Sequence, residues 1–197
     1  MLAMVDSGGA NIASVRFALE RLGVRSELTA DPAVIRAAER VILPGVGSAA
    51  EGMKRLQARG LVDCVRQLTQ PVLGVCLGMQ LLFEASEEGP TPTLGLIPGR
   101  VALLPDSPGI QVPHMGWNTL HADRRPGLLD GIGPDARFYF VHSFAAPVNE
   151  FTLARCTHGT TFAAIVQRGN FSGVQFHPER SGPAGARLLQ NFVEGRT

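Results

Sequence analysis

Cys76 carries the clearest chemical signal in the chain, because it stands in the pentapeptide Gly74-Val75-Cys76-Leu77-Gly78. The pentapeptide follows an apolar run typical of a strand, Val72–Val75, and opens a segment typical of a helix. A nucleophile between a strand and a helix, with glycine two residues away on either side, has the pattern of a nucleophile elbow. Glycine is needed at those positions because the sharp turn brings backbone segments too close for side chains. We therefore predict that Cys76 is a catalytic nucleophile.

The predicted turn also favours the reactive form of the thiol. The N–H groups and the dipole at a helix N-terminus stabilise a thiolate, which is the nucleophilic form. We expect the N–H of Leu77 to point toward the group under attack, where it would stabilise the oxyanion of a tetrahedral intermediate. The alternative interpretation is a small buried core residue, as free cysteines often are. Cys64 and Cys156 lack the glycine context and are interpreted in that way.

A base and a carboxylate to orient it follow in the second half of the chain. Of the five histidines, His177 ends the apolar run Gly173–Phe176. We predict that it lies at the C-terminal edge of a strand, where open α/β sheets bind ligands. Pro178 favours extended backbone in the residue before it, and residues i and i+2 of an extended chain point to the same side. Glu179 can therefore reach His177 and stabilise its imidazolium, although an ordinary turn is the alternative.

The elements that must position these residues alternate in the first half of the chain. Short apolar runs, typical of buried strands, alternate with apolar residues at helical spacing. Strands separated by helices indicate an α/β fold with a mostly parallel central sheet and helices on both faces, a flavodoxin-like core. The expected strands are Leu2–Val5, Val24–Leu28, Arg40–Leu43 and Val72–Val75. The expected helices are Ile12–Leu22, a segment that begins at Asp31-Pro32, residues 48–69 with a break near Gly60, and Leu77–Ala85.

The second half is rich in short apolar or alternating runs separated by Gly, Pro, Asn and Asp, which favours added antiparallel strands. These runs are Val101–Leu104, Trp117–His121, Phe138–His142, Phe151–Cys156, Ala163–Gln167 and Gly173–Phe176. A last helix is expected over residues 184–194, and residues 84–93 form the loosest stretch. Because no linker or internal repeat stands out, we predict a single domain over residues 1–197.

The overall composition excludes several classes of protein. Of the 197 residues 45% are hydrophobic and 18% are charged, which indicates a folded chain rather than a disordered one. A net charge of +1, without runs of like charge, indicates neither a nucleic-acid nor a membrane partner. No apolar run approaches the ~18 residues of a membrane-spanning helix. The three widely spaced cysteines fit neither a disulfide framework nor a zinc site, so we expect a cytoplasmic protein without a metal or a cofactor.

Together the two motifs resemble those of the class I, triad-type glutamine amidotransferases. The matching segments are Gly74–Gln80 and Gly173–Glu179, and Pro44–Gly47 is similar to the oxyanion strand of that family. The resemblance implies that Cys76 attacks the side-chain amide carbon of glutamine. It also implies that His177 passes the thiol proton to the departing ammonia, and that water hydrolyses a glutamyl thioester.

The resemblance implies two further groups of residues around the triad. The oxyanion hole would consist of Gly45, Val46 and Leu77. The substrate glutamine would be held by Gly47, Gln80, Ser143 and Phe144.

Further segments narrow the resemblance to the glutaminase subunits of imidazole glycerol phosphate synthases. They are Val112–Asn118, Tyr139–Ser143 and Glu179–Gly182, and the opening Asp6–Asn11 is similar as well. This resemblance implies a heterodimer with a (β/α)8-barrel cyclase subunit. That subunit would use the ammonia to make imidazole glycerol phosphate and an aminoimidazole carboxamide ribotide in histidine biosynthesis. The surface that faces it would include Trp117, Tyr139 and Arg180.

Several alternatives stay open at the level of the sequence. The glutaminase could serve another synthase, such as one that makes anthranilate or pyridoxal phosphate. The chain could also be a non-catalytic homologue on the same fold, although the intact triad argues against it. A peptidase-like relative with a cysteine elbow is conceivable, but Gln80 and the segment around Trp117 argue against that. His142, at the end of an apolar run, is interpreted as a core histidine with satisfied hydrogen bonds rather than as a catalytic group.

Overall fold

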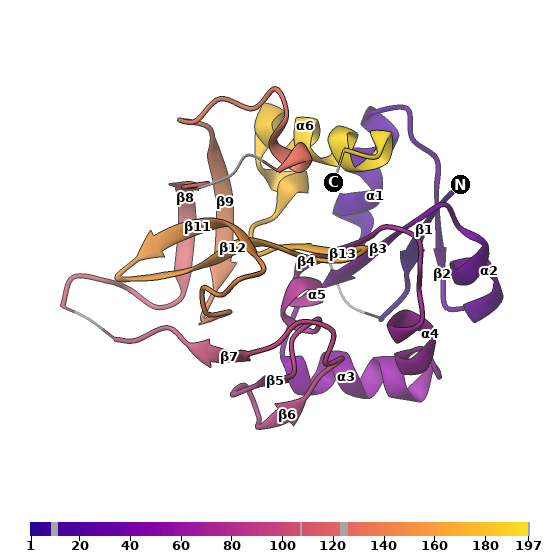
Figure 1. The fold of residues 1–197 in the computed structure, drawn as a ribbon, viewed down its shortest axis with the longest axis horizontal. Helices are drawn as coiled ribbons and strands as arrows, with labels where there is room; N and C mark the ends of the chain where they lie inside the picture. Colours follow the sequence, from indigo (N-terminus) through magenta and orange to yellow (C-terminus); the bar gives the residue numbers. More distant parts are fainter. Residues whose placement is uncertain (9–11, 107, 123–125, 197) are drawn as a thin grey trace.

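The computed structural model of the protein describes residues 1–8, 12–106, 108–122 and 126–196 (Figure 1). Residues 9–11, part of the Asp6–Asn11 segment singled out above, lie outside the described residues. A seven-stranded sheet has the strand order β11-β12-β13-β4-β3-β1-β2. The neighbouring strands β13, β4, β3, β1 and β2 run parallel to one another. At the β13 edge, β12 and β11 extend the sheet in the antiparallel sense. In chain order these strands are β1 (Leu2–Val5), β2 (Ser26–Thr29), β3 (Arg40–Gly45), β4 (Val72–Cys76), β11 (Thr152–His158), β12 (Thr160–Arg168) and β13 (Phe171–Val174).

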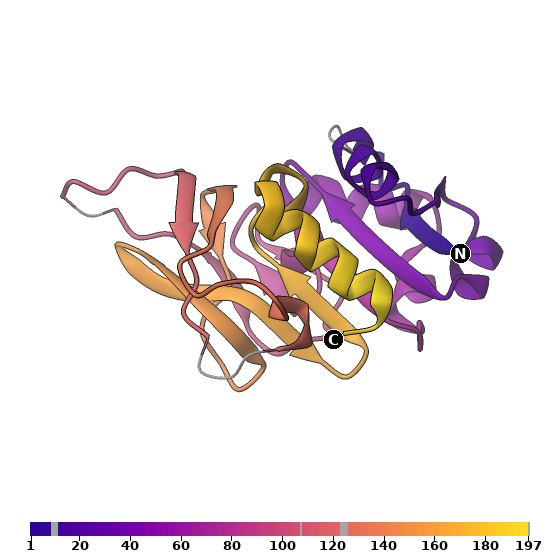
Figure 2. The same ribbon diagram turned by 90° about the horizontal axis from the view of Figure 1, so that it is seen from above.

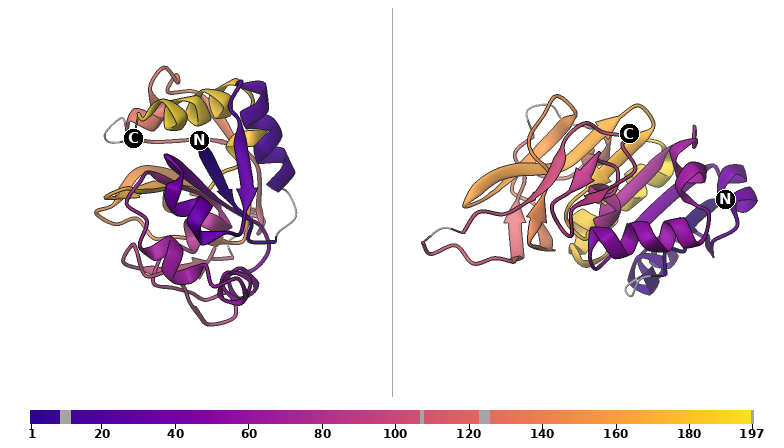
Figure 3. Two further views of the ribbon diagram at one scale, coloured as in Figure 1. Left: turned by 90° about the vertical axis from the view of Figure 1, so that its right-hand side faces the viewer. Right: turned by 90° about the horizontal axis from the view of Figure 1, so that it is seen from below.

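Helices cover both faces of this sheet (Figures 1 and 3). One face packs against α1 (Ile12–Arg21) and α6 (Gly182–Glu194). The other packs against α2 (Pro32–Ala37), α3 (Ala49–Ala58), α4 (Val62–Arg66) and α5 (Leu77–Gln80). Side chains alternate between the two faces, since Leu2 and Met4 of β1 belong to the first core and Ala3 and Val5 to the second. The predicted α/β class with helices on both faces is confirmed.

Two smaller sheets lie beside the β11–β12 end of the main sheet. β8 (His114–Thr119) and β9 (Arg137–His142) form an antiparallel ribbon, at the left of Figure 1. A second sheet has the order β10-β7-β5-β6, with β5 (Ala85–Ser86), β6 (Thr91–Pro92), β7 (Arg100–Leu103) and β10 (Phe144–Ala145). Two 3-10 helices complete the fold, η1 (Gly127–Leu129) and η2 (Pro178–Arg180). The antiparallel strands predicted for the second half are therefore present.

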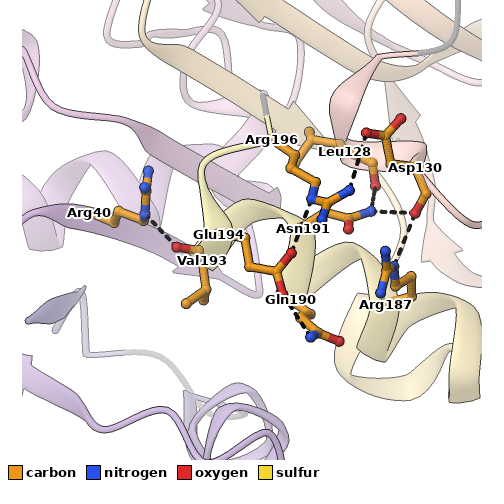
Figure 4. Close-up of polar contacts among 9 residues, drawn as sticks. All are labelled: Arg40, Leu128, Asp130, Arg187, Gln190, Asn191, Val193, Glu194 and Arg196. Atoms are coloured by element: carbon orange, nitrogen blue, oxygen red, sulfur yellow. Dashed lines mark hydrogen bonds and ion pairs between the residues drawn. The ribbon is translucent and has the colours of Figure 1, made fainter.

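Helix α6 is fastened at its C-terminal end by a set of polar contacts (Figure 4). Asn191 donates two hydrogen bonds from Nδ2, to the carbonyls of Leu128 at 3.0 Å and Asp130 at 2.8 Å. The guanidinium of Arg40, on β3, donates to the carbonyl of Val193 at 2.8 Å. α6 follows directly on η2, and in Figure 2 it lies along the sheet in full view. These contacts therefore hold the C-terminal half of α6 against η1 and β3.

Several of the sequence-based element boundaries need correction. The helix predicted over Leu77–Ala85 ends at Gln80, because the carbonyls of residues 81–83 accept hydrogen bonds from residues 94–97 instead. The neighbouring residues 84–93 contain the short strands β5 and β6. The strand predicted over Trp117–His121 begins at His114, since residues 114–116 pair with the end of β9. The predicted break near Gly60 is confirmed by the separation of α3 from α4.

A further correction concerns the strand that leads to His177. The strand predicted over Gly173–Phe176 is β13, which ends at Val174. The N–H of Gln175 still donates to the carbonyl of Ala164 on β12, whereas the N–H of His177 donates to the carbonyl of Tyr139 on β9, both at 2.9 Å. His177 is therefore positioned jointly by β13 and the β8–β9 ribbon. Within the described ranges, none of the helices has the length and apolar character needed to cross a membrane.

Candidate active site

Cys76 stands at a strained turn between β4 and α5. Its backbone has φ 53° and ψ −112°, and among the described residues it is the only non-glycine residue with positive φ. Such a conformation costs about 1–3 kcal/mol and persists only where the surrounding structure enforces it, often at functional sites. The side chain is 8% exposed. The turn predicted for a nucleophile elbow is thus present in the structure.

The glycines around the turn are required by close backbone contacts. A Cβ atom on Gly78 would lie 1.8 Å from the carbonyl oxygen of Leu43 on β3. A Cβ on Gly74 would lie 2.7 Å from the carbonyl of Gly78, and one on Gly45 would lie 2.8 Å from the nitrogen of Gly78. Real Cβ atoms essentially never approach other heavy atoms this closely. The steric reason given above for the glycine spacing is confirmed.

His177 and Glu179 are brought to Cys76 from the neighbouring strand, since β13 pairs with β4. The Nδ1 atom of His177 lies 2.8 Å from Oε1 of Glu179, and the two side chains are 4% and 0% exposed. The imidazole also forms a hydrogen bond with the thiol of Cys76. Because Nδ1 faces the carboxylate, Nε2 is the nitrogen left for the sulfur, as in a nucleophile–base–carboxylate triad.

The surroundings of His177 favour the protonated form of its imidazole ring. Burial lowers the pKa of His177, but the hydrogen bonds with Cys76 and Glu179, and the negative charges of both groups, outweigh it. The net effect raises the pKa of His177 from 6.5 to about 10. An imidazolium is therefore held next to the sulfur at neutral pH, and an oriented base beside a cysteine is the arrangement of an activated nucleophile.

A cavity of about 300 Å³ opens beside Cys76. The four residues expected to hold glutamine all line it, namely Gly47, Gln80, Ser143 and Phe144. Val46 and Leu77, expected in the oxyanion hole, line it as well. Gly45 does not line this cavity and instead lies against the backbone of the elbow. A pocket of this size is at the small end of ligand sites, which suits a ligand such as one amino acid.

The amide of Gln80 is engaged mainly within the protein. Its Nε2 donates to the carbonyl of Phe144 at 2.8 Å and to Oε1 of Gln175 at 2.9 Å. Nε2 of Gln175 lies in turn 3.9 Å from the sulfur of Cys76, within reach of a hydrogen bond to sulfur. These bonds use both hydrogens of the Gln80 amide, so its own contact with a ligand is limited to Oε1. Gln80 thus links the nucleophile to the backbone at Phe144.

Gln175 and Glu88 belong to the site but are not predicted from the sequence. Gln175 is completely buried, and it precedes His177 by two residues, so the alternation used for Glu179 could have found it. Glu88 is the one acidic residue among the described residues that line the cavity. Its carboxylate accepts a hydrogen bond from the N–H of Ala49, at the start of α3, at 2.8 Å. No local pattern indicates Glu88, because it lies in the stretch interpreted as loose.

The three residues expected at a partner surface lie together. Trp117 and Tyr139 are cross-strand neighbours in the β8–β9 ribbon, and their rings meet edge to face at 5.8 Å. The guanidinium of Arg180 lies over the Tyr139 ring, 4.6 Å from its centroid. Trp117 is half-exposed. These three residues are named here the Trp117 cluster, and one of them, Arg180, directly follows Glu179 in the chain. Among the described residues, no group of His, Cys, Asp and Glu side chains is arranged to bind a metal ion.

Comparison with known proteins gives consistent matches along the whole chain. The family described as "Glutamine amidotransferase class-I" matches residues 3–195. The "Imidazole glycerol phosphate synthase subunit HisH" of Xanthomonas axonopodis pv. citri (strain 306) is 55% identical over 193 residues, which are 98% of this chain and 96% of that protein. The HisH subunit of Xylella fastidiosa (strain Temecula1 / ATCC 700964) is 54% identical with the same coverage.

A solved structure described as a glutamine amidotransferase matches with a TM-score of 0.75 and covers 98% of this chain and 97% of that one. At 23% identity this likeness shows the fold alone. A second, described as a glutamine amidotransferase from Thermotoga maritima, has a TM-score of 0.58 at 15% identity and covers 98% of this chain and 80% of that one. The chain therefore belongs to the class I glutamine amidotransferases and, among them, to the HisH family of imidazole glycerol phosphate synthase subunits.

Proposed function

We propose that this protein hydrolyses glutamine to glutamate and ammonia with Cys76, His177 and Glu179, as the glutaminase subunit of an imidazole glycerol phosphate synthase in histidine biosynthesis. The observation that carries the proposal is the buried His177–Glu179 pair, 2.8 Å apart, hydrogen-bonded to a strained Cys76 at the wall of a ligand-sized cavity. The 55% identity to a HisH subunit supports the choice of synthase over one that makes anthranilate or pyridoxal phosphate. The free state of all three buried cysteines is consistent with a cytoplasmic location.

The reaction follows from the arrangement of the triad. The Cys76 thiolate attacks the amide carbon of glutamine, and the N–H of Leu77 with the backbone at Gly45–Val46 stabilises the oxyanion. His177 gives its proton to the amide nitrogen, which leaves as ammonia while a glutamyl thioester forms. His177 then takes a proton from water, whose oxygen attacks the thioester and releases glutamate. Cys76 leaves as the thiolate, which restores the ion pair.

Recognition of glutamine is assigned to the walls of the 300 Å³ cavity. Glu88 supplies a negative charge to the α-ammonium group of the substrate, since charged groups in a partly closed site need an opposite partner. Gly47 and the backbone at Ser143–Phe144 form the remaining walls. Gly47 has φ +91°, a conformation that disfavours any other residue at this position.

A direct test of this function is ammonia release from glutamine, measured with and without the nucleotide-bound (β/α)8-barrel cyclase subunit. We expect clear stimulation by the cyclase subunit, because the ammonia is useful only when it passes to that partner. No stimulation, or recovery of a different synthase on co-purification from cell extract, would contradict the assignment.

The cyclase subunit is proposed to dock on the Trp117 cluster. Trp, Tyr and Arg are the residue types most often found to dominate binding energy at interfaces, and this cluster combines one of each. We expect Trp117→Ala to raise the Kd for the cyclase subunit by roughly 10- to 100-fold, as measured by isothermal titration calorimetry. Phe17→Ala is the matched control, because Phe17 on α1 is 49% exposed against 50% for Trp117. Equal Kd values for the two variants would show that the Trp117 cluster does not belong to the interface.

Glu179→Gln is expected to lower kcat for glutamine hydrolysis by roughly 10²- to 10⁴-fold in the complex with the cyclase subunit. The amide can donate a hydrogen bond to Nδ1 of His177, which would leave the imidazole in the wrong tautomer for a base facing Cys76. Steady-state release of glutamate measures the effect. Glu20→Gln, on the exposed surface of α1, is the control and should behave like the wild type. A loss of less than tenfold would exclude Glu179 as the orienting group.

The same substitution should change how stability depends on pH. Because folding raises the pKa of His177 from 6.5 to about 10, its protonation stabilises the folded chain. That contribution is complete below pH 6.5 and is lost as the pH rises through about 10. Glu179 causes part of the shift, so the wild type should exceed Glu179→Gln in unfolding temperature by more at pH 6.5 than at pH 10. If the difference in unfolding temperature, measured by circular dichroism, did not change with pH, the result would contradict the assigned ion pair.

A further inference from the structure

Two buried histidines outside the triad connect the cavity to the β8–β9 ribbon. Nδ1 of His142 lies 2.8 Å from the carbonyl oxygen of Phe144, and Nε2 of His142 lies 3.1 Å from Nδ1 of His114. Nε2 of His114 is in turn 3.4 Å from Nδ2 of Asn118, which also donates to the carbonyl of Thr157 at 3.0 Å. The reaction steps above use none of these side chains. His142 nevertheless lines the same cavity as Cys76.

The chemistry of the groups fixes the direction of this chain of hydrogen bonds. A carbonyl oxygen can only accept, so His142 must carry its proton on Nδ1. In a neutral ring Nε2 is then an acceptor, and His114 must donate from its own Nδ1. Burial and nearby imidazoles lower the pKa of His142 to about 3 and that of His114 to about 4, although the Phe144 carbonyl opposes the shift for His142. Both rings are thus neutral at physiological pH, and one arrangement of donors and acceptors satisfies every link.

Both rings are also held firmly in place. His114 is 3% exposed and lies between the rings of Phe140 and His158, with centroids 4.7 Å and 4.1 Å away. His142 is 7% exposed and meets the ring of Phe162 edge to face. In so apolar a setting, an aliphatic or aromatic side chain would pack without the cost of burying polar nitrogens. Packing alone therefore does not explain the presence of His114 and His142 at these positions.

The carbonyl of Phe144 is the junction of two hydrogen-bonded chains. From one side it accepts from Gln80, which is connected through Gln175 to the sulfur of Cys76. From the other side it accepts from His142. These two donors occupy both lone pairs of the oxygen. The carbonyl is thus not free for a ligand, and its fixed position sets the backbone wall at Ser143–Phe144.

The ribbon that carries the two histidines has two distinct faces. His114 and His142 are directly paired across the ladder, and their strands point Phe138 and Phe140 into the core as well. The alternate positions of β8 face outward, where Met115 is 64% exposed and Trp117 is 50% exposed. The outer face thus carries the proposed docking residue Trp117, whereas the inner face carries His114 and His142, and His142 lines the cavity.

We propose that His142 and His114 are positioning residues of the glutamine site, which hold the Phe144 carbonyl and the adjoining cavity wall at a position set by the β8–β9 ribbon. The inference rests on the proposed glutaminase function and adds two residues to it. The two partners of His142, the Phe144 carbonyl and His114, do not belong to the triad. We therefore expect a displaced wall to weaken the binding of ground state and transition state alike. The expected signature is a raised KM with little change in kcat.

The test compares His142→Leu with His142→Asn in the complex with the cyclase subunit. Leucine fills the space without a donor, whereas the asparagine amide places an N–H near the former Nδ1. We expect His142→Leu to raise the KM for glutamine roughly tenfold, with kcat within about threefold of the wild type. His142→Asn should restore most of the affinity. His114→Phe, which keeps an aromatic ring but loses the donor, should raise KM in the same direction by a smaller factor.

A control variant and an alkylation assay distinguish a failure of the positioning role from a failure of the proposed function. His121→Phe, at an exposed histidine beyond the end of β8, should leave KM unchanged. Alkylation of Cys76 by iodoacetamide should proceed at the wild-type rate in all variants, which shows that the triad is assembled. An unchanged KM in His142→Leu, or an asparagine variant no better than leucine, would overturn the positioning role. A wild-type complex that does not hydrolyse glutamine would instead overturn the proposed function, and this inference with it.

Discussion

Cys76→Ala is expected to abolish glutamine hydrolysis, with a loss of roughly 10⁴- to 10⁶-fold in kcat. The sulfur is the group placed to form the thioester, and neither His177 nor the oxyanion donors can replace it. The substitution removes a single buried atom and leaves the strained backbone at φ 53° to be maintained by its surroundings. Activity should therefore be lost without loss of the fold. Glutamate release in the presence of the cyclase subunit measures the effect.

Two comparisons make this result specific. Cys64→Ala removes a thiol on α4 that is also buried, 1% exposed against 8% for Cys76, and that does not line the cavity. We expect that variant to lose some stability but to keep its kcat. The complex that contains Cys76→Ala should also still use added ammonium salt in place of glutamine, since the proposed cyclase reaction needs only ammonia. Residual glutaminase activity within tenfold of the wild type would show that Cys76 is not the nucleophile.

The elbow and the contact between His177 and Glu179 could be predicted because their signals are local. The glycines at positions 74 and 78 report a backbone contact that tolerates no side chain, and the structure contains that contact. Glu179 follows His177 by two residues, so extended backbone alone brings the two side chains together. Such constraints are short in sequence and are therefore visible without knowledge of the fold.

The surroundings of the triad could not be predicted in the same way, because they depend on contacts between distant segments. Glu88 comes to the cavity through a segment whose course is set by the pairing of residues 84–87 with residues 99–101, in a loop that also includes residues 94–97. The helix after Cys76 ends early for the same reason, since its next carbonyls bond to that loop. His142 was interpreted as a satisfied core histidine, and its two ring nitrogens do have partners. The fact that it also lines the cavity depends on the register of β8 with β9.

Gly78→Ala is expected to destabilise the protein by more than about 4 kcal/mol, enough to unfold many domains of this size. The new Cβ would lie 1.8 Å from the carbonyl oxygen of Leu43. The oxygen belongs to the backbone and the position of the Cβ is fixed by the backbone, and Leu43 is paired with Gly74 in the central parallel ladder. The clash therefore cannot be relieved by a rotamer change and requires β3 and the elbow to separate. Soluble yield and the urea midpoint of unfolding measure the loss.

A graded series of glycine substitutions tests this explanation. A Cβ on Gly133 would have no neighbour within 4 Å, so Gly133→Ala should change stability by no more than about 0.5 kcal/mol. A Cβ on Gly52, in α3, would meet only the ends of the Leu77 and Leu81 side chains at 3.2 Å, which can move. Gly52→Ala should therefore lie between the other two. If all three unfolded at the same urea concentration, the contact between β3 and the elbow would not be tight. A loss of stability that increases in the order Gly133, Gly52, Gly78 would instead show that the close backbone contact between β3 and the elbow limits which residues the fold accepts.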